Sequence, residues 1–333
     1  MYSRHYLFTI KLGIIILCVQ TLKAQYRLPV YTDYLTDNYY ILHPAMAGAH
    51  YEGMKVRSSY RTQWLGTPNA PSMQTFNAHA RVGDRSGVGG MFFHDKNGFQ
   101  SQLGFQATYA HHINFTSSRS EINQLSFGFS GGGSFYRHDQ SSFDPTSDVL
   151  VQGTKLNSSS FFVDAGISYN YFNLYAHLTV RNLVFVGNQI NDEVILSKPK
   201  RVLASVGMFM EMASRWALEP SILADFIQYV DRPTVDISLK SHHDLRSSQF
   251  WGGLSFRKGL TNTLTQYETI PYAEPYSQLT LITGIRHNKW MFSYTYTLGL
   301  GDKIINPSGF HQFTLGIDIL SDEFRPTFIR GIL

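Results

Sequence analysis

Three short patterns in the sequence contain residue types that could do chemistry. Residues 128–132 read Gly-Phe-Ser-Gly-Gly, which matches the G-x-S-x-G pattern of a serine nucleophile on a strained turn between a strand and a helix. Paired histidines occur at 111–112 and at 242–243, and Asp244 follows the second pair. Imidazoles and carboxylates are common metal ligands, so each pair is a candidate metal site. Whether any pattern can work depends on the element that carries it.

The elements around these patterns are predicted to be β-strands. In residues 312–319, apolar side chains alternate with polar ones, which is the period-two pattern of a strand with one apolar face. With a first strand at Met54–Trp64 and a less regular one at Gly87–Asp95, this alternation predicts fourteen strands and no amphipathic helix. The other strands are expected at Thr75–Val82, Gln102–Tyr109, Leu125–Ser130, Phe161–Tyr171, Leu174–Val180, Val202–Met212, Trp216–Phe226, Val235–Leu239, Phe250–Phe256, Leu279–Ile285 and Trp290–Leu298.

A strand setting argues against each of these chemistries. Ser130 falls inside an alternating strand with no helix after it, whereas a serine nucleophile of this type needs the sharp turn. Neighbouring histidines on a strand point to opposite faces, so neither pair can bind one ion through both rings. The glycine-rich stretches lack the spacing of a phosphate-binding loop. We therefore expect a non-enzymatic protein with no catalytic, cofactor-binding or metal-binding residues.

Composition and connection lengths predict that the strands form an all-β, antiparallel transmembrane β-barrel. Only 16% of the 333 residues are charged, against about 25% in typical soluble domains, and no apolar run reaches the ~18 residues that a membrane helix needs. Long connections are expected after odd-numbered strands, at 138–158, 182–200, 258–275 and 299–308. Those after even-numbered strands are mostly short, at 83–86, 116–121, 172–173, 213–215 and 287–289, with 240–248 intermediate. Long loops on one rim and tight turns on the other are typical of outer-membrane barrels, whose tight turns lie in the periplasm.

The apolar faces of the predicted strands are expected to meet lipid. They carry no charged residue where the alternation is clear, and a Lys or Arg at the bilayer midplane would cost roughly 2–4 kcal/mol. An open strand edge in lipid would leave backbone groups unpaired, so the sheet is expected to close. Aromatic residues near strand ends are expected to line the membrane interfaces. They are Trp64, Tyr109, Tyr171, Trp216, Trp251, Tyr276 and Trp290.

Charged residues on the polar faces form two groups that a fourteen-strand barrel would place on opposite walls. The basic group comprises Lys55, Arg57, Arg61, His79 and Arg81, and the acidic group comprises Glu211, Glu219, Asp225 and Asp236. In one interpretation these charges find partners in plug residues, loops or water and stabilise a filled lumen. In the other they create a transverse field that orients a polar segment or a solute.

The amino terminus has the layout of a secretory signal peptide. Arg4 and Lys11 precede a short apolar stretch at Leu12–Val19, and cleavage is expected near Ala24. The single cysteine, Cys18, would leave with the signal peptide, and the mature chain would then hold no thiol. The mature chain would carry nearly equal numbers of basic and acidic residues, so the sequence does not predict a basic surface for binding nucleic acid. The expected organisation is a signal peptide at 1–24, an N-terminal periplasmic or plug segment at 25–53, a barrel at 54–320 and a C-terminal tail at 321–333.

Segments near the two ends of the chain resemble the PorP/SprF family of type IX secretion system membrane proteins. The first reads YRLPVYTDYLTDNYYILHPAMAG and then SSYRTQWLGTPNAP, and the second reads FSYTYTLGL and then PSGFHQFTLG. The chain departs from the family pattern at His43, where Asn is usual, and at Phe310 and Gln312. The matching positions include Pro29, Tyr31, Tyr34, Asn38, Pro44, Ala45, Gly48, Arg61, Gln63, Trp64, Pro71 and His311.

The resemblance implies a role in protein secretion. Members of the family lie in the outer membrane and serve the secretion and surface attachment of large proteins with a C-terminal sorting domain, some of which are gliding-motility adhesins. The expected partners are such a client, the translocon or periplasmic ring components, and outer-membrane lipid, with no nucleic acid. Apolar loop residues could bind the client by capturing its sorting domain. They are Phe143, Val149, Leu150, Phe185, Val186, Ile195, Leu260, Tyr267 and Tyr272.

Three alternatives remain open at this point. The apolar loop residues could fold against one another over the barrel mouth. The barrel could be a solute channel or a transporter of hydrophobic molecules, in which case ion flux or a lipid-like molecule in the lumen is expected. A barrel hydrolase would need Ser, His and Asp clustered on one rim, and the sequence shows no convincing cluster of this kind.

Overall fold

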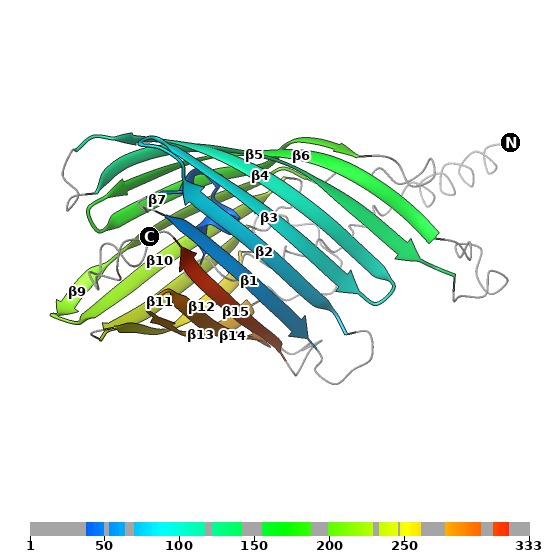
Figure 1. Ribbon diagram of the computed structural model, residues 1–333. Coiled ribbons are helices and arrows are strands. Elements are labelled where there is room, and N and C mark those ends of the chain that lie inside the picture. Colours follow the sequence, from blue (N-terminus) through cyan, green and yellow to red (C-terminus); the bar gives the residue numbers. More distant parts are fainter. Residues whose placement is uncertain are drawn as a thin grey trace, which may run out of the picture. The chain divides into compact units, whose positions relative to one another are not determined.

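The strands of the chain form one antiparallel β-sheet that curls round and closes on itself (Figure 1). The computed structural model describes residues 38–49, 53–63, 70–116, 122–141, 155–187, 199–228, 233–245, 247–260, 277–300 and 309–319. The predicted signal peptide and the predicted C-terminal tail lie outside the described residues.

The sheet contains fifteen labelled strands that pair with their neighbours in chain order. They are β1 (Met54–Gln63), β2 (Ser72–Arg81), β3 (Ser86–Asn97), β4 (Gln100–Asn114), β5 (Asn123–Asp139), β6 (Lys155–Tyr171), β7 (Leu174–Gly187), β8 (Arg201–Met208), β9 (Met210–Ala213), β10 (Trp216–Ile227), β11 (Thr234–Asp244), β12 (Ser248–Gly259), β13 (Ser277–His287), β14 (Trp290–Leu300) and β15 (Phe310–Ile319). β8 and β9 both pair with β10 and are two pieces of one strand interrupted at Phe209, so the barrel has the predicted fourteen strands.

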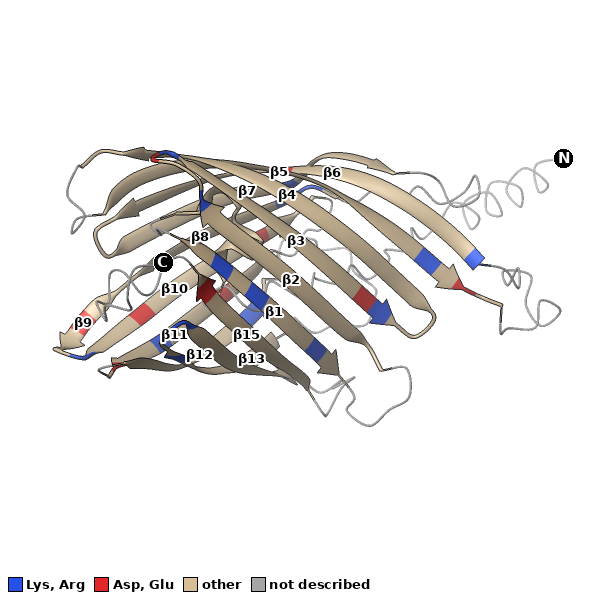
Figure 2. Cartoon of the chain, in the orientation of Figure 1, with Lys and Arg blue, Asp and Glu red and all other residues tan. Residues whose placement is uncertain are grey.

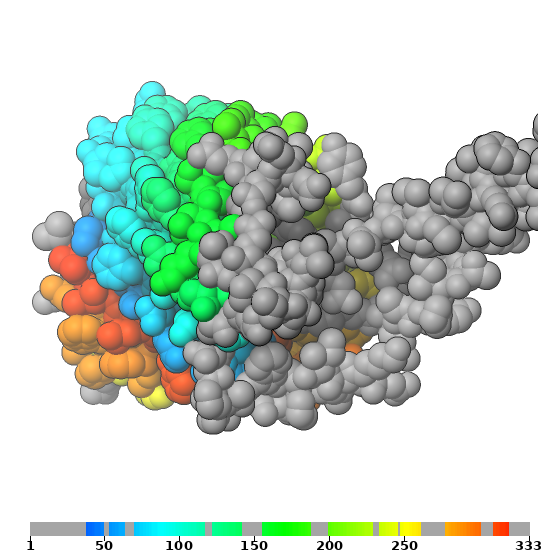
Figure 3. All heavy atoms as spheres, turned by 90° about the vertical axis from the view of Figure 1, so that its right-hand side faces the viewer, coloured from blue at the N-terminus to red at the C-terminus, as the bar shows by residue number. Residues whose placement is uncertain are grey.

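Pairing between the first and the last strand closes the barrel. β1 and β15 are antiparallel over their whole length, from Met54 opposite Ile319 to Gln63 opposite Phe310. Figure 3 shows the blue first strand beside the orange-red end of the chain, as this register requires. Closure leaves no free sheet edge at this seam. The backbone N–H and C=O groups of β1 and β15 therefore bond to one another and do not need water as a partner.

The two rims of the barrel differ in the length of their connections. We call one the tight-turn rim, because β6–β7, β9–β10, β11–β12 and β13–β14 are joined there at 172–173, 214–215, 245–247 and 288–289. We call the other the long-loop rim, because it carries the connections 140–154, 188–200, 260–276 and 301–309, together with one tight turn at 98–99.

Several predicted boundaries are wrong because the strands are longer than the alternation indicates. The predicted intermediate connection 240–248 is a tight turn, since β11 runs to Asp244 and β12 begins at Ser248. The predicted loop at 138–158 loses its ends to β5 and β6, and the loop predicted from 182 begins only after Gly187. Residues 155–160 read Lys-Leu-Asn-Ser-Ser-Ser, so both faces of β6 are largely polar there and the alternation disappears.

Apolar side chains cover the outer face of the barrel and polar side chains cover the inner face. β4 and β14 contain no Lys, Arg, Asp or Glu, and Figure 2 shows few charged residues along the middle of β2–β6. Exposed large apolar residues include Phe76, Phe92, Leu103, Phe129, Phe161, Ile237, Phe292 and Phe313, and buried polar ones include Asn77, Gln106, Ser168, Thr179, Thr280 and Thr297. This reversal of the soluble pattern is that of a barrel whose outer surface meets lipid.

The predicted interfacial aromatics lie on the outer surface with one exception. Tyr109, Tyr171, Trp216 and Trp290 are exposed, whereas Trp64 and Tyr276 lie outside the described residues. The prediction for Trp251 is wrong, because its neighbour Phe250 takes the outward position and Trp251 faces the lumen. There it packs against Ile282 and Met291, and the ammonium of Lys240 lies 5.6 Å from its ring centre.

A short non-strand segment precedes β1 and lies within the barrel (Figure 1). It consists of a one-turn helix, α2 (Tyr39–Leu42), and a 3-10 turn, η2 (Pro44–Met46), which contacts β4, β5 and β6. None of the helices among the described residues is long and apolar enough to cross a membrane.

Candidate functional site

Residues 38–49, which we call the lumenal segment, pack against the inner face of the barrel. Pro44 begins η2, where the missing N–H costs no hydrogen bond and the fixed φ suits the first turn. The preceding residue, His43, is extended (φ −123°, ψ 101°) and separates α2 from η2. All residues from 39 to 49 are buried, so the segment is an integral part of the barrel interior.

The second half of the lumenal segment is held through its backbone. The N–H of Gly48 donates to Nδ1 of His79 on β2 over 3.0 Å, and Nε2 of His112 on β4 lies 2.9 Å from the carbonyl oxygen of Ala47. Gly48 has a φ of +68°, which glycine adopts without strain. Because buried backbone groups need partners, the two histidines satisfy atoms that the short η2 leaves open.

Glycines on the wall make room for this half of the segment. A Cβ atom on Gly87 would lie 1.9 Å from the oxygen of Ala47, and one on Gly128 would lie 2.2 Å from the nitrogen of Ala45. Such separations are far below van der Waals contact, so no larger residue fits while the segment stays in place. Gly128 is the first glycine of the G-x-S-x-G pattern, and close packing is its physical role. We call Gly87 and Gly128 the glycine cradle.

The serine of that pattern also has a structural role. Ser130 is buried within β5, and its hydroxyl lies 2.8 Å from that of Thr108 on β4. No strand-to-helix turn is present at this position, since β5 continues as a strand from Asn123 to Asp139. The local backbone therefore differs from the one that a serine nucleophile of this class requires.

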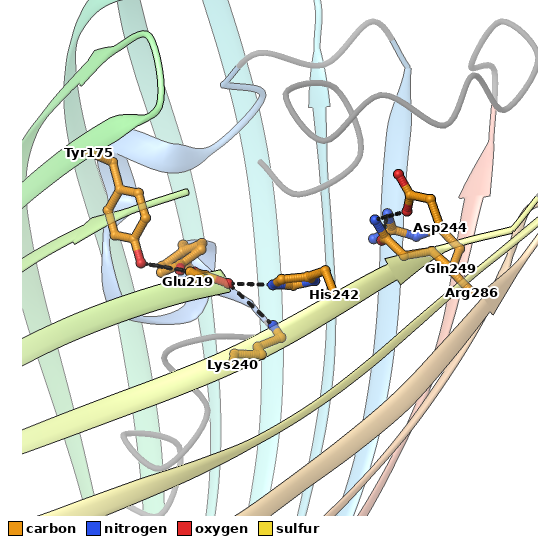
Figure 4. A network of polar contacts seen from close by, with 8 residues as sticks. Tyr175, Glu219, Lys240, His242, Asp244, Gln249 and Arg286 are labelled. Carbon is orange, nitrogen blue, oxygen red and sulfur yellow. Dashed lines mark hydrogen bonds and ion pairs between the residues drawn. The ribbon is translucent and has the colours of Figure 1, made fainter. Parts of the chain in front are cut away.

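The first half of the lumenal segment is held through its side chains, chiefly by a buried carboxylate. The hydroxyl of Tyr39 donates to Oε1 of Glu219 on β10, and the hydroxyl of Tyr175 on β7 donates to the same oxygen over 2.9 Å. The second oxygen, Oε2, lies 2.8 Å from Nε2 of His242 and 3.9 Å from Nζ of Lys240, both on β11. Figure 4 shows these wall residues converging on Glu219, and we call the five residues the Glu219 cluster. Three hydrogen bonds and the nearby ammonium of Lys240 offset the cost of burying this carboxylate.

Two further side-chain contacts fasten the first half of the segment. The hydroxyl of Tyr40 donates to Oγ1 of Thr108 over 3.0 Å, and Nδ2 of Asn38 donates to Oδ1 of Asn77 on β2, also over 3.0 Å. The ring of Tyr40 fills the space above Gly89, where a Cβ would approach it to 2.6 Å. Burial raises the pKa of Tyr40 to about 12, so its hydroxyl keeps its proton and can donate.

His43 lies at the middle of the lumenal segment, between two wall hydroxyls. Its Nδ1 is 2.9 Å from Oγ1 of Thr179 on β7, and its Nε2 is 3.1 Å from Oγ of Ser205 on β8. Burial, and then the nearby His177 and Arg181, hold the pKa of His43 well below its ordinary value. The ring is therefore neutral and exchanges hydrogen bonds with both hydroxyls without needing a counter-ion.

The wall residues that hold the lumenal segment lie near the tight-turn rim. Tyr175 is the second residue of β7 and Glu219 is the fourth residue of β10. His79 and His242 each come two residues before the end of their strand, β2 and β11 respectively. Since all four of these strand ends belong to the tight-turn rim, the segment crosses the lumen beside that rim.

Two of the four acidic residues predicted on the polar faces, Asp225 and Asp236, are paired with arginines of adjacent strands. Arg201 binds Asp225 through two nitrogens, with Nε 2.6 Å from Oδ1, and Arg257 binds Asp236 with both contacts at 2.6 Å. Glu219 is the acidic residue that reaches the lumenal segment. This arrangement favours the interpretation in which the charges stabilise a filled lumen, with wall arginines as the principal partners in place of the expected plug, loop or water groups.

A second chain of polar contacts follows β11, β12, β13, β15 and β1 along the tight-turn rim. Nη1 of Arg57 lies 2.8 Å from Asp318, and Nε of Arg286 lies 3.8 Å from the same carboxylate. Arg286 also donates to Gln249 over 3.4 Å, and Gln249 donates to Asp244 over 2.8 Å. Figure 4 shows Arg286, Gln249 and Asp244 together beside the Glu219 cluster. This chain gives the basic residues of β1 an acidic counterpart on the neighbouring strand.

The predicted histidine pairs divide between the two faces, as expected for neighbours on a strand. His112 and His242 face the lumen, where they contact Ala47 and Glu219, whereas His111 and His243 lie outside it, with the ring of His243 4.1 Å from that of Trp216. Among the described residues, no group of three or more histidine, cysteine or acidic side chains is placed to hold a metal ion.

The structure brings part of the family signature together in the lumenal segment. Asn38, Pro44, Ala45 and Gly48 all belong to it, which the sequence resemblance alone could not reveal. The other described signature residues lie on or beside strands: Arg61 and Gln63 end β1, Pro71 precedes β2, and His311 on β15 has its Nδ1 2.8 Å from the hydroxyl of Tyr294. Pro29, Tyr31, Tyr34 and Trp64 lie outside the described residues.

Most of the loop residues proposed to bind a client also lie outside the described residues. They are Phe143, Val149, Leu150, Ile195, Tyr267 and Tyr272. The prediction that Phe185 and Val186 belong to a loop is wrong, because β7 continues to Gly187. Leu260 follows β12 directly and is 45% exposed.

Sequence reasoning did not identify the Glu219 cluster as a unit. It placed Glu219 on a polar face and named residues 25–53 as a plug or docking segment, but it could not connect Tyr39 with Tyr175, Lys240 and His242. These residues are far apart in the sequence, and only the register between β10 and β11 brings Glu219 opposite Lys240. The concentration of tyrosines before β1 was the available signal.

A closed antiparallel barrel with an apolar outer face and a polar, occupied lumen defines the outer-membrane class of β-barrel protein. Within this class, residues 23–317 match the family of the type IX secretion system membrane protein PorP/SprF. Because the match covers most of the sequence, the chain belongs to this family. No curated protein matches the chain as a relative.

Solved structures of outer-membrane barrels are among those similar to the chain, and one of them has a TM-score above 0.5. The CymD monoaromatic hydrocarbon channel is 9% identical with a TM-score of 0.52, and the match covers 87% of this chain and 94% of that chain. The toluene transporter TodX of Pseudomonas putida is 10% identical with a TM-score of 0.43, covering 85% of this chain and 93% of that chain. At this level of identity the similarity to CymD describes the fold alone.

Proposed function

We propose that the protein is a non-enzymatic outer-membrane barrel of the type IX secretion and gliding system. It receives or anchors a secreted, adhesin-type surface protein through the C-terminal sorting domain of that client. The observation that carries the proposal is the family match over residues 23–317, which includes the lumenal segment and all of the barrel except the last two residues of β15. The polar groups at the centre of the barrel support the proposal, because they have structural roles. Glu219 and its partners hold the lumenal segment, and Arg201 and Arg257 each pair with a carboxylate on the neighbouring strand.

The long-loop rim is the proposed site of client binding. Outer-membrane barrels direct their long loops to the outside of the cell, so a surface client meets this rim first. The wall is tallest there at β5 and β6, each running for 17 residues, against 10 for β1 and β15. Beside this wall, Val186 is 62% exposed near the end of β7. Elsewhere on the same rim, Leu260 follows β12 and is 45% exposed. Exposed apolar residues on a rim are suited to bury against a partner.

The remaining parts of the chain are assigned by the same reasoning. Residues 1–24 act as a signal peptide cleaved near Ala24, residues 25–53 form a plug or periplasmic docking piece, and residues 321–333 form a tail. With the tight turns in the periplasm, the start of β1 and the end of β15 face the translocon and the periplasmic ring. These components are the proposed periplasmic partners.

Deletion of the gene tests the anchoring role. We expect the large adhesin-type client to be missing from the cell surface and to accumulate in the periplasm or in the medium, and the unaltered gene to restore display. A matched pair of variants, Val186→Asp on the rim and Val82→Asp at the opposite end of the barrel, locates the binding surface. Normal display in the deletion strain would refute the anchoring role.

A second candidate function is an outer-membrane channel or a transporter of hydrophobic solutes. One observation favours it: the hydrogen bonds of the lumenal segment described above go to β2, β4, β7, β8 and β10, whereas hydroxyls such as those of Thr280 and Thr297, 3.0 Å apart, line the wall at β13 and β14. Steady ion flux through the purified barrel, or a lipid-like molecule bound in its lumen, would support this candidate over the first.

A further inference from the structure

We propose that the lumenal segment is a strap with one fixed end and one releasable end. Residues 44–48 stay in the glycine cradle, whereas residues 38–42 leave the Glu219 cluster and swing away from the wall, which opens the barrel beside the tight-turn rim. The proposal rests on the assignment of residues 25–53 as a plug, made above. It is carried by the different ways in which the two halves of the segment are held.

The fixed end is locked by shape and by backbone hydrogen bonds. Gly128 and Gly87 approach the backbone of Ala45 and Ala47 so closely that no Cβ could stand between them. Three bonds from the wall hold the adjoining peptide groups: His112 to the Ala47 oxygen, the Gly48 N–H to His79, and Arg81 to the Gly48 oxygen at 3.2 Å. Removing this end would leave two buried ring nitrogens without a partner, which is costly.

The two tyrosine hydroxyls of the releasable end can leave without stranding the groups that they bind. When the Tyr39 hydroxyl departs, Glu219 keeps Tyr175, His242 and Lys240, so no buried carboxylate is left unpaired. The same holds for Thr108, the partner of Tyr40, because its hydroxyl also lies 2.8 Å from that of Ser130. The tyrosine hydroxyls themselves exchange these partners for water. The wall partners of both tyrosines therefore keep a hydrogen bond after release.

The backbone between the two ends has the form of a hinge. α2 is a single turn whose N-cap, Asn38, makes no side-chain capping bond, so little helical structure is lost if it moves. His43 is extended before Pro44, and a small rotation about its backbone changes the direction of everything that precedes it. The swing breaks the Asn38–Asn77 bond and the bond that Arg181 donates to the Ile41 oxygen. A pull on the chain before residue 38 acts directly on this end.

Removal of two hydroxyl groups tests the releasable end. In planar lipid bilayers we expect the wild-type barrel to be closed with rare, brief openings, and the double variant Tyr39→Phe with Tyr40→Phe to open at least about tenfold more often. Tyr169→Phe is the matched control, because its hydroxyl lies on the outer face and donates to Asn123. Heat-modifiable migration on gels verifies that each barrel is folded. Equal opening frequencies in all three folded proteins would overturn the proposal.

A disulfide across the releasable end tests which part moves. Cys18 is the single cysteine, so Asn38→Cys with Asn77→Cys in a Cys18→Ser background gives one possible bond, at a pair of side chains already in contact. Combined with the Tyr39→Phe and Tyr40→Phe changes, it should abolish the openings when oxidised and restore them when reduced. Openings that persist in the oxidised protein would refute the strap. Surface display of the client is scored separately in the deletion strain, so failure of the strap and failure of the anchoring role are distinguishable.

Discussion

Replacement of Gly128 by alanine is the sharpest test of how the lumenal segment is seated. The new Cβ would lie 2.2 Å from the nitrogen and 2.6 Å from the Cα of Ala45, whereas ordinary contacts begin at 3.4 Å. The backbone of the segment must therefore move away from β5 by about 1 Å. This movement would lengthen the hydrogen bonds that hold Ala47 and Gly48 to the wall. Overpacking of this kind costs about 1–3 kcal/mol, and the involvement of backbone on both sides places the expected value in the upper half of that range.

The same strand contains a matched control at Gly131. A Cβ there meets only the ring of Phe161 at 3.9 Å, an ordinary contact. Alanine is favoured over glycine in a strand interior by about 0.5–1 kcal/mol, so Gly131→Ala should be neutral or slightly stabilising. The two variants are thus expected to differ by about 2–4 kcal/mol, although each adds one methyl group to β5.

Urea unfolding of both variants in lipid vesicles, followed by tryptophan fluorescence, measures this difference. Both midpoints are compared with that of the wild-type protein under identical lipid and salt conditions. If Gly128→Ala unfolded at the same urea concentration as Gly131→Ala, the segment would not be seated in the glycine cradle. The G-x-S-x-G pattern would then need another explanation.

Three further outcomes are expected. Arg201→Ala leaves a buried carboxylate unpaired and should cost about 3–5 kcal/mol of unfolding free energy, whereas Lys155→Ala breaks an exposed ion pair and should leave the unfolding free energy nearly unchanged. Burial keeps His43 neutral below its ordinary pKa of 6.5, so the unfolded chain binds one more proton at this residue in acid. The contribution of His43 to stability is therefore complete above that pH and is lost below it by up to about 1.4 kcal/mol per pH unit. His43→Gln should reduce the acid dependence of stability by this one-proton share in urea titrations at several pH values. Brominated lipids should quench the fluorescence of Trp290 on the outer surface and leave that of Trp251 in the lumen nearly unchanged, as single-tryptophan variants would reveal.

The alternation of apolar and polar side chains was sufficient to predict the fold. A strand in a membrane barrel separates lipid from a polar lumen along its whole span, so each residue reports its face through its polarity, and the strand count follows. The boundaries failed where this separation ends. At 155–160 both faces are largely polar, and at 182–187 a register irregularity between β6 and β7, with Asn182 at a positive φ, breaks the alternation.

The lumenal contacts were much less predictable. Trp251 follows Phe250 directly, so the alternation places its side chain on the polar face of the strand. Its position near a strand end nevertheless suggested a membrane interface. Pro44 and Ala45 stood out through family resemblance, which carries no information about what they touch. The partner of Tyr39 lies 180 residues away, and three-dimensional register alone brings Glu219 to it.

Site-specific photo-crosslinking in living cells tests the central claim most directly. A photoreactive amino acid at Val186 or Leu260 on the long-loop rim should yield an adduct with a secreted client, and deletion of the client's C-terminal sorting domain should abolish the adduct. The same amino acid at Phe76, on the lipid-facing surface of β2, should give none. If both rim positions gave no adduct while the client was displayed normally, the barrel would not be its receptor.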